Sequence, residues 1–270
     1  MADPRRYALC VEYDGTDFVG WQRQTGLRSV QGVLEQALSI VADAPLDVVA
    51  AGRTDAGVHA SGQVVHFDTA RERPARAWVR GTNANLPPDV AVRWVRPVAD
   101  DFHARFGATG RRYRYVVCDR RSRPALERRH VCWTRREVDL ARMQRAAEPL
   151  LGRHDFSAYR ASQCQARSPV RTLRRLDVAR AGEMITFRVE ADAFLHHMVR
   201  NLVGSLLRVG RGDADEQWPA RVLETGDRRL AGATAPAAGL TLTGVAYPER
   251  YGLPEPDCPG RATCDGGVGL

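Results

Sequence analysis

The chain has 270 residues, of which 44% are hydrophobic and 27% are charged, so it can bury a full core in one large domain or two small ones. Its start lacks the long apolar segment of a signal peptide, and no window approaches the roughly 18 to 20 apolar residues of a membrane span, so we expect a cytoplasmic protein without a membrane partner. The six cysteines are scattered, with no CxxC pair and no Cys/His cluster, which predicts free thiols and no metal site.

The formal net charge is +8, and all 40 basic residues are arginine. An excess of positive charge fits a polyanionic partner, although a charge bias without such a partner is the alternative interpretation. The absence of lysine excludes a phosphate loop of the GxxxxGK type and any Schiff-base mechanism.

The first hundred residues predict the order strand, helix, strand, strand, helix, strand. Ser29 can cap the first helix, whose apolar residues recur at the i, i+3, i+4 and i+7 spacing of a buried stripe. The short strands are rich in β-branched residues. The expected ranges are 7–13, 30–41, 47–51, 63–68, 75–84 and 90–95.

The second half predicts similar elements. Asp139 can cap a helix that starts at Leu140, and strict alternation of apolar and polar residues marks 184–190 as a half-buried strand. The other expected elements are strands at 112–118, 173–179 and 240–247 and a helix at 193–209.

Each half therefore matches the βαββαβ plan. We expect an α+β fold of two ferredoxin-like halves, 1–104 and 105–253, whose antiparallel sheets merge around a central basic cleft. The Gly- and Pro-rich segment 254–270 has little to bury, and we expect it to be disordered.

Segment 102–129, FHARFGATGRRYRYVVCDRRSRPALERR, interleaves nine arginines with four aromatic residues. Arginines that neutralise phosphates and aromatic rings that stack on unpaired bases are typical of proteins that bind RNA loops or single strands, whereas a solvated charged strand is the alternative. Tyr113 and Tyr115 share one strand face, and Arg112 and Arg114 share the other. Tyr113 is therefore expected to face the core or a pocket.

The helix expected at 193–209 separates an apolar stripe from a second row, His196, Arg200 and Gly204. The row is either solvent-exposed or part of a site. The neighbouring His196 and His197 are not expected to act as a ligand pair, because adjacent residues in a helix point in different directions.

The stretch AAGRTDAGVH at 50–59 places Asp55 between an arginine and a glycine. The triplet Asp55-Ala56-Gly57 suits a simple turn. Alternatively, a carboxylate held ionised by a nearby arginine is a competent nucleophile or general base. Arg53 lies two residues away, so on an extended segment it would share a face with Asp55.

Taken together, six segments resemble the tRNA pseudouridine synthase A family, in that family's order and from about residue 6 to 253. The combination of GRTDAG with RxYxY downstream is specific, whereas any one segment alone is not. The segments are YDGTDFVGWQRQ (13–24), AGRTDAGVH (51–59), FHARF (102–106), RRYRY (111–115), FLHHMVRN (194–201) and APAAGLTL (235–242).

The resemblance implies an enzyme that isomerises uridine to pseudouridine at positions 38, 39 and 40 of the tRNA anticodon stem-loop, as a homodimer and without a metal or other cofactor. Asp55 would attack the flipped uridine, at the ribose C1′ or at the base C6, and Arg53 would pair with Asp55 and hold the nucleotide out of the stack. Tyr113 would stack on the base and assist proton removal, Leu240 would line the pocket, and Arg200 would face the cleft.

The resemblance also implies two loops that contact tRNA, FHARF and QCQAR, and Arg121 of the basic segment is counted with them. The RNA-contacting residues expected on this basis are Phe102, His103, Ala104, Arg105, Phe106, Gln163, Cys164, Gln165, Ala166, Arg167 and Arg121.

Two other functions stay open. A non-catalytic RNA-binding protein would share the basic and aromatic segment but would tolerate Asp55→Asn. A glycoside hydrolase that pairs Asp55 with Asp17 would explain the acids but not the arginines.

Overall fold

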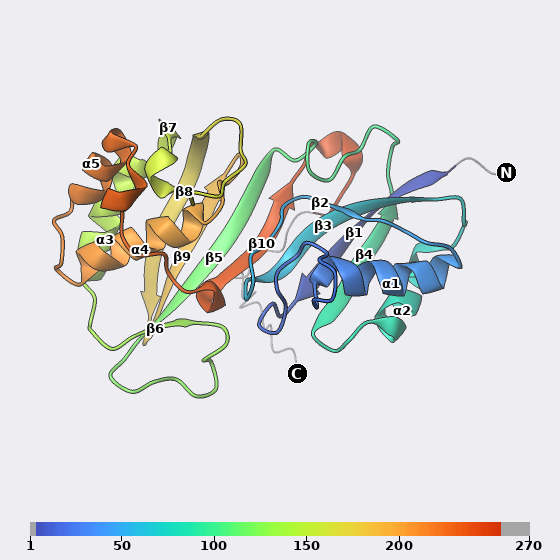
Figure 1. Cartoon of the computed structure of the whole chain (residues 1–270), viewed down its shortest axis with the longest axis horizontal. Helices are drawn as coiled ribbons and strands as arrows, with labels where there is room; N and C mark the ends of the chain where they lie inside the picture. Colours follow the sequence, from blue (N-terminus) through green and yellow to red (C-terminus); the bar gives the residue numbers. More distant parts are fainter. Residues whose placement is uncertain (1–3, 255–270) are drawn as a thin grey trace, which may run out of the picture.

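The computed structural model describes residues 4–254, and one mixed sheet organises this part of the chain (Figure 1). The sheet has ten strands in the order β4-β1-β3-β10-β5-β9-β8-β7, with β2 paired to β3 and β6 paired to β5. Among the pairs that the described residues form, β10 with β3 and β5 with β6 are parallel, and the others are antiparallel. The expected combination of helices with a large, mostly antiparallel sheet is confirmed.

The strands are β1 (Arg5–Tyr13), β2 (Val49–Ala50), β3 (His59–Thr69), β4 (Val90–Pro97), β5 (Gly110–Asp119), β6 (Cys132–Thr134), β7 (Gly152–Asp155), β8 (Val170–Ala181), β9 (Met184–Ala191) and β10 (Leu240–Ala246). The helices are α1 (Val30–Ala42), α2 (Ala75–Asn85), α3 (Leu140–Ala147), α4 (Met198–Gly210) and α5 (Trp218–Thr225). None of the helices in the described range is long and apolar enough to span a bilayer.

The sequence located most of these elements. The two predicted caps are present: the Ser29 hydroxyl accepts a hydrogen bond from the Gly32 amide, and the Asp139 carboxylate accepts one from the Arg142 amide. The short elements β6, β7 and α5 were not predicted from the sequence, and the helix expected from residue 193 begins at Met198. The expectation of a disordered tail falls on residues that, beyond 254, lie outside the described part of the chain.

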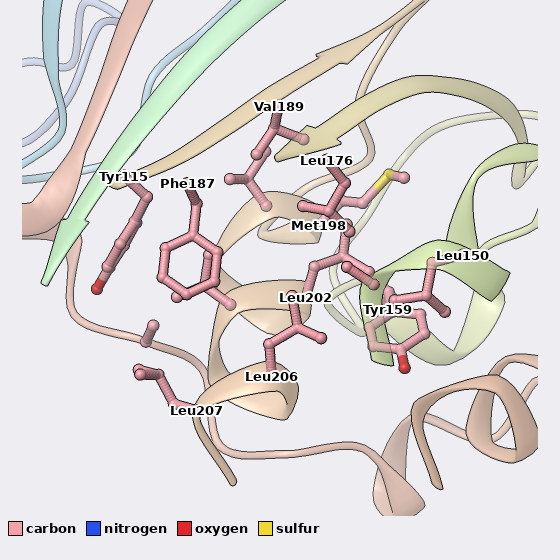
Figure 2. Packing of buried hydrophobic residues seen from close by; sticks show 14 of the residues in the cluster. Tyr115, Leu150, Tyr159, Leu176, Phe187, Val189, Met198, Leu202, Leu206 and Leu207 are labelled. Atoms are coloured by element: carbon pink, nitrogen blue, oxygen red, sulfur yellow. The ribbon is translucent and has the colours of Figure 1, made fainter. Parts of the chain in front are cut away.

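The helices cover one face of the sheet in two groups, each with its own core. The core beneath α3 and α4 is built from inward-facing residues of β5, β8 and β9 together with one face of α4 (Figure 2). The core beneath α1 and α2 is built from β1, β3 and β4. Tyr113 on β5 packs against both cores. Tyr113 therefore lies at the boundary between the two cores.

The loop that carries Asp55 is held against the segment after β1. A Cβ atom on Gly15 would lie 1.9 Å from the Val58 carbonyl oxygen, and one on Gly20 would lie 2.8 Å from the Thr54 carbonyl oxygen. The buried Tyr13 hydroxyl lies 2.8 Å from the Thr54 hydroxyl. Because only glycine permits these close backbone approaches, the YDGTDFVGW and GRTDAG segments depend on each other for their conformation.

Candidate active site

Asp55 lies in the β2–β3 loop, opposite the start of α4. Its carboxylate contacts three basic side chains from the C-terminal half: Oδ1 is 3.1 Å from His196 Nε2, and Oδ2 is 3.3 Å from His197 Nε2 and 3.2 Å from an Nη of Arg200. The Asp55 side chain keeps 24% of its surface exposed. The Asp55 carboxylate is thus held by three side-chain contacts and keeps one side open to a ligand.

The two histidines act together, contrary to the sequence-based expectation. They precede α4, and His197 adopts a left-handed backbone conformation with φ of 62°. Their ring centroids lie 4.0 Å apart, so both rings reach Asp55. Burial lowers the pKa of His197, and the charge of Asp55 opposes this shift. The expectation assumed that both histidines lie in a helix, whereas they form a turn before it. The left-handed conformation of His197 costs about 1 to 3 kcal/mol.

Arg200 takes the place that the sequence analysis gave to Arg53. The Nε of Arg200 donates to the Ala235 carbonyl at 2.7 Å while an Nη donates to Asp55, so the guanidinium is fixed at both ends. Arg53 is exposed and has no ion pair with Asp55 or any other described residue. The partners of Asp55 come from segment 196–200 instead, and the two-residue spacing did not predict them.

Tyr113 lies near Asp55, whereas Leu240 lies opposite Tyr115 on the neighbouring strand. The Tyr113 ring meets Phe194 edge to face, with centroids 5.1 Å apart. Leu240 is buried in the core beneath α4, and Leu242, two residues further along β10, lies opposite Tyr113. Burial, with smaller contributions from the charges of Tyr13 and Asp55, raises the pKa of Tyr113 far above its usual value. Its hydroxyl therefore remains protonated near neutral pH.

The basic segment divides into structural and free arginines. Arg111 donates to the carbonyls of Ala51, Arg105, Ala108 and Asp192, and so ties the FHARF segment to two other loops. Other arginines of the segment form ion pairs: Arg112 with Glu190, Arg120 with Glu183 and Arg129 with Asp17. Arg121 is exposed and has no partner among the described residues.

The FHARF loop has an inner and an outer set of side chains. Phe102 and Ala104 are fully buried, so their side chains cannot contact RNA from this position, which corrects the expectation for these two residues. Arg105 and Phe106 point outward: Phe106 is 78% exposed, and the Arg105 guanidinium lies 5.6 Å from the centre of its ring. His103 is partly buried, with its ring against Phe106.

The QCQAR loop is joined to the histidine turn beside Asp55. The Ala161 amide donates to the His196 carbonyl at 2.9 Å, and the Cys164 amide donates to the Ala161 carbonyl. Cys164 and Ala166 pack against the core beneath α4. The exposed residues of the loop are Gln163, Gln165 and Arg167.

Asp17 is not part of this constellation. Its carboxylate pairs with Arg129, and 61% of its side-chain surface is exposed. Among the described residues, Asp17 and Asp55 therefore share no ion-pair partner. A glycoside hydrolase that uses these two acids as its catalytic pair has no support in the structure.

Comparison with known proteins gives one answer. The profile of the family described as tRNA pseudouridine synthase matches residues 9–107 and 146–248. A protein named tRNA pseudouridine synthase A from Pectobacterium atrosepticum is 54% identical over 253 residues, which cover 94% of this chain and 89% of that protein. A protein of the same name from an Enterobacter species is 55% identical over 251 residues, which cover 93% of each chain. One from Escherichia coli is 54% identical over 251 residues and covers 93% of each chain. The chain belongs to the tRNA pseudouridine synthase family.

Proposed function

We propose that this chain converts uridine to pseudouridine at positions 38, 39 and 40 of the tRNA anticodon stem-loop, with Asp55 as the nucleophile. The observation that carries the proposal is the Asp55 carboxylate, held by Arg200 and two histidines near Tyr113. A preorganised carboxylate in a partly closed site suits attack on an extruded nucleotide.

The reaction is an isomerisation and balances without an added reductant or oxidant. The N1–C1′ bond breaks, a C5–C1′ bond forms, C5 loses its proton and N1 gains one. Because its hydroxyl stays protonated, Tyr113 would serve first as a stacking surface and a hydrogen-bond donor. A proton acceptor at C5 would then have to be another group of the site or water.

The remaining side chains take roles consistent with their positions. Arg53, exposed beside Asp55 and free of a protein partner among the described residues, would bind the phosphate of the extruded nucleotide or fill its place in the stack. Leu240 would limit the depth of the pocket. His103, Arg105, Phe106, Gln163, Gln165, Arg167 and Arg121 would contact the RNA outside the pocket.

The proposal extends to organisation and partners. The order β4-β1-β3-β2 in the first half is that of a ferredoxin-like unit, which supports two such halves, 1–104 and 105–253, with the cleft between them. We further propose a cytoplasmic homodimer that binds one tRNA across both subunits and uses no cofactor.

The test is tritium release from unmodified tRNA that carries 5-³H-uridine, measured for wild type, Asp55→Asn and Tyr113→Phe. Wild type should release tritium without added cofactor, and Asp55→Asn should bind tRNA but release none. Tyr113→Phe should keep its tRNA affinity and lose rate if the hydroxyl donates in catalysis. Asp17→Asn is the matched control, because it removes an exposed acid and should leave the rate unchanged.

Two outcomes would contradict the proposal. If wild type binds tRNA yet is silent on every uridine, the protein is an RNA-binding module and the enzyme assignment fails. If Asp55→Asn retains full activity, the nucleophile assignment fails while the enzyme assignment stands.

A further inference from the structure

A second group of basic and acidic side chains lies outside the site of Asp55. It consists of Asp14 after β1, His59 at the start of β3 and His130 at the end of the loop between β5 and β6. Asp14 Oδ1 is 3.1 Å from His59 Nδ1, and Asp14 Oδ2 is 3.4 Å from His130 Nε2. Because consecutive members lie 45 and 71 positions apart, the sequence shows no metal motif.

The two distances from the Asp14 carboxylate, 3.1 and 3.4 Å, are close to the spacing of zinc ligands. Four ligands at about 2.0 to 2.1 Å from a tetrahedral Zn²⁺ lie about 3.3 Å from one another, and imidazole nitrogens with one carboxylate are ligands that Zn²⁺ accepts. The three ligand atoms of this cluster all lie within 4.8 Å of one another. Small rotations of exposed His130 would bring its nitrogen to bonding distance.

The outer contacts orient two of the ligands. His59 Nε2 lies 2.9 Å from the Arg129 carbonyl oxygen and 3.2 Å from the Ala238 carbonyl oxygen, so this nitrogen carries the proton and Nδ1 presents its lone pair. The Asp14 carboxylate accepts hydrogen bonds from the Thr16 amide and hydroxyl. A histidine that donates its other N–H to a carbonyl, beside a hydrogen-bonded carboxylate, is the usual outer shell of a metal site.

One contact competes with a metal. The Gly15 amide donates to His59 Nδ1 at 3.1 Å, and this hydrogen bond would have to yield. A neutral hydrogen bond contributes little net stability, so coordination by three side chains can replace it.

There is room for a fourth ligand. A cavity of about 300 Å³ opens beside the three residues and is lined by Glu12, Asp89 and Arg114 among others. Asp89 pairs with Arg28 and Glu12 with Arg93, so the negative charge offered to a cation is that of Asp14, and water can occupy the open position.

The site of Asp55 offers a comparable set, Asp55, His196 and His197, but differs in charge. There the Arg200 guanidinium lies 3.2 Å from Asp55 Oδ2 and opposes a second cation. No guanidinium of the described residues forms an ion pair with Asp14. The Asp14 cluster is therefore the better cation site.

We propose that Asp14, His59 and His130 bind a zinc-type divalent transition-metal ion. The ion would fasten the arginine-rich loop at 120–131 to the turn after β1, whose Gly15 packs on the loop that carries Asp55. This inference does not depend on the proposed catalytic activity.

The test is equilibrium dialysis of the metal-free full-length protein against Zn²⁺, with Co²⁺ absorption as the second readout. Wild type should bind Zn²⁺ at this site and give the visible bands of tetrahedral Co²⁺ without the charge-transfer band of a thiolate ligand. His130→Ala should weaken binding at this site by at least about 10-fold, since it removes a ligand. His130 is exposed, so this variant should fold.

Two control variants separate this site from other histidines. His154→Ala, on β7, and the double variant His196→Ala/His197→Ala should both retain Zn²⁺ binding. Zn²⁺ should also raise the thermal midpoint of wild type but not that of His130→Ala. The proposal is overturned if wild type binds no Zn²⁺, if His130→Ala binds as wild type does, or if binding is lost only in the double variant.

Discussion

Asp55 gains its counter-charge from Arg200, which lies 145 positions later in the chain. The Arg200 side chain is only 15% exposed, and both ends of its guanidinium donate, one to the Ala235 carbonyl and one to Asp55. Arginine suits this place because its planar, rigid group can hold two acceptors in fixed directions. The direction of the Asp55 carboxylate thus depends on side chains of the opposite half, of which Arg200 is the one fixed at both ends.

Replacing that side chain tests this dependence. Arg200→Lys keeps the charge but cannot reach Ala235 and Asp55 together, so the carboxylate should lose its fixed direction. We expect kcat for tritium release to fall about 100-fold, the usual effect of misplacing a reacting group by about 1 Å. tRNA affinity, measured by filter binding, should change little. Arg208→Lys, on the same helix with its guanidinium over the Trp218 ring, is the control and should keep its kcat. An unchanged kcat in Arg200→Lys would mean that a positive charge beside Asp55 is sufficient for the reaction and that the fixed direction of the carboxylate is not required.

At the scale of elements, α4 lies so close to the loop after α5 that one position requires glycine. A Cβ atom on Gly204 would lie 1.8 Å from the Ala233 carbonyl oxygen, and the Ala235 amide nearby donates to the Arg200 carbonyl. The sequence left the row of His196, Arg200 and Gly204 open between solvent exposure and a site, and in the structure Gly204 makes this backbone contact.

Gly204→Ala should push the loop away from α4. We expect a loss of about 1 to 3 kcal/mol in the free energy of unfolding, the usual cost of overpacking, together with reduced activity as Ala235 withdraws from Arg200. Urea unfolding followed by circular dichroism measures the first effect. Gly52→Ala is the control, because a Cβ there would have open space and stability should stay within about 0.5 kcal/mol. Equal stability of the two variants would contradict the close contact.

The buried His66 makes the FHARF loop sensitive to pH. Its Nδ1 accepts a hydrogen bond from the Ala104 amide at 3.1 Å, and burial, with the charges of Arg6 and His103, lowers the pKa of His66 to about 4. The unfolded chain binds the proton at a pKa near 6.5, so between pH 6.5 and 4 the unfolded state holds more protons than the folded state. Stability should therefore fall as the pH falls through this window, by up to about 3 kcal/mol at its lower end.

His66→Asn tests this pH dependence, because an amide oxygen can accept from Ala104 but does not titrate. Chemical unfolding at pH 7 and pH 4.5 should show a smaller loss of stability in His66→Asn than in wild type. His154→Asn removes a histidine that is not buried and should behave as wild type. A wild-type pH dependence that persists in His66→Asn would place the sensitivity elsewhere.

These elements also show what the sequence could and could not predict. Local rules located α1 from Ser29 and its apolar stripe, and strand 184–190 from its alternation, because caps and periodicity are properties of neighbouring residues. The pairing of Asp55 with Arg200 depends on two segments folding together, and local spacing pointed to Arg53 instead. Likewise, a left-handed residue at His197 has no signature in a run such as FLHHM. The family resemblance favoured a catalytic role for Asp55, which the residues alone left open between a turn and a nucleophile.

For the molecule as a whole, one continuous sheet joins the two cores. β10, the last strand of the described residues, lies between β3 of the first half and β5 of the second, in the middle of the sheet (Figure 1). Asp55 comes from the first half, whereas Arg200, the histidines and Tyr113 come from the second. A site assembled in this way exists only when both halves are folded and docked.

The net charge of +8 predicts tRNA binding that weakens steeply with salt, because cations that neutralise phosphates release bound counterions. The arginines that can neutralise phosphates are those that are exposed and form no ion pair within the described residues. Arg105, Arg121 and Arg167 are of this kind. Arg121→Ala should reduce the slope of log affinity against log salt by about 0.7 to 0.9, the contribution of one phosphate contact. Filter binding across a series of potassium chloride concentrations measures the slope. Arg145→Ala is the control, since Arg145 is engaged by Glu216 and should leave the slope unchanged. Equal slopes for wild type and Arg121→Ala would remove Arg121 from the RNA-contacting surface.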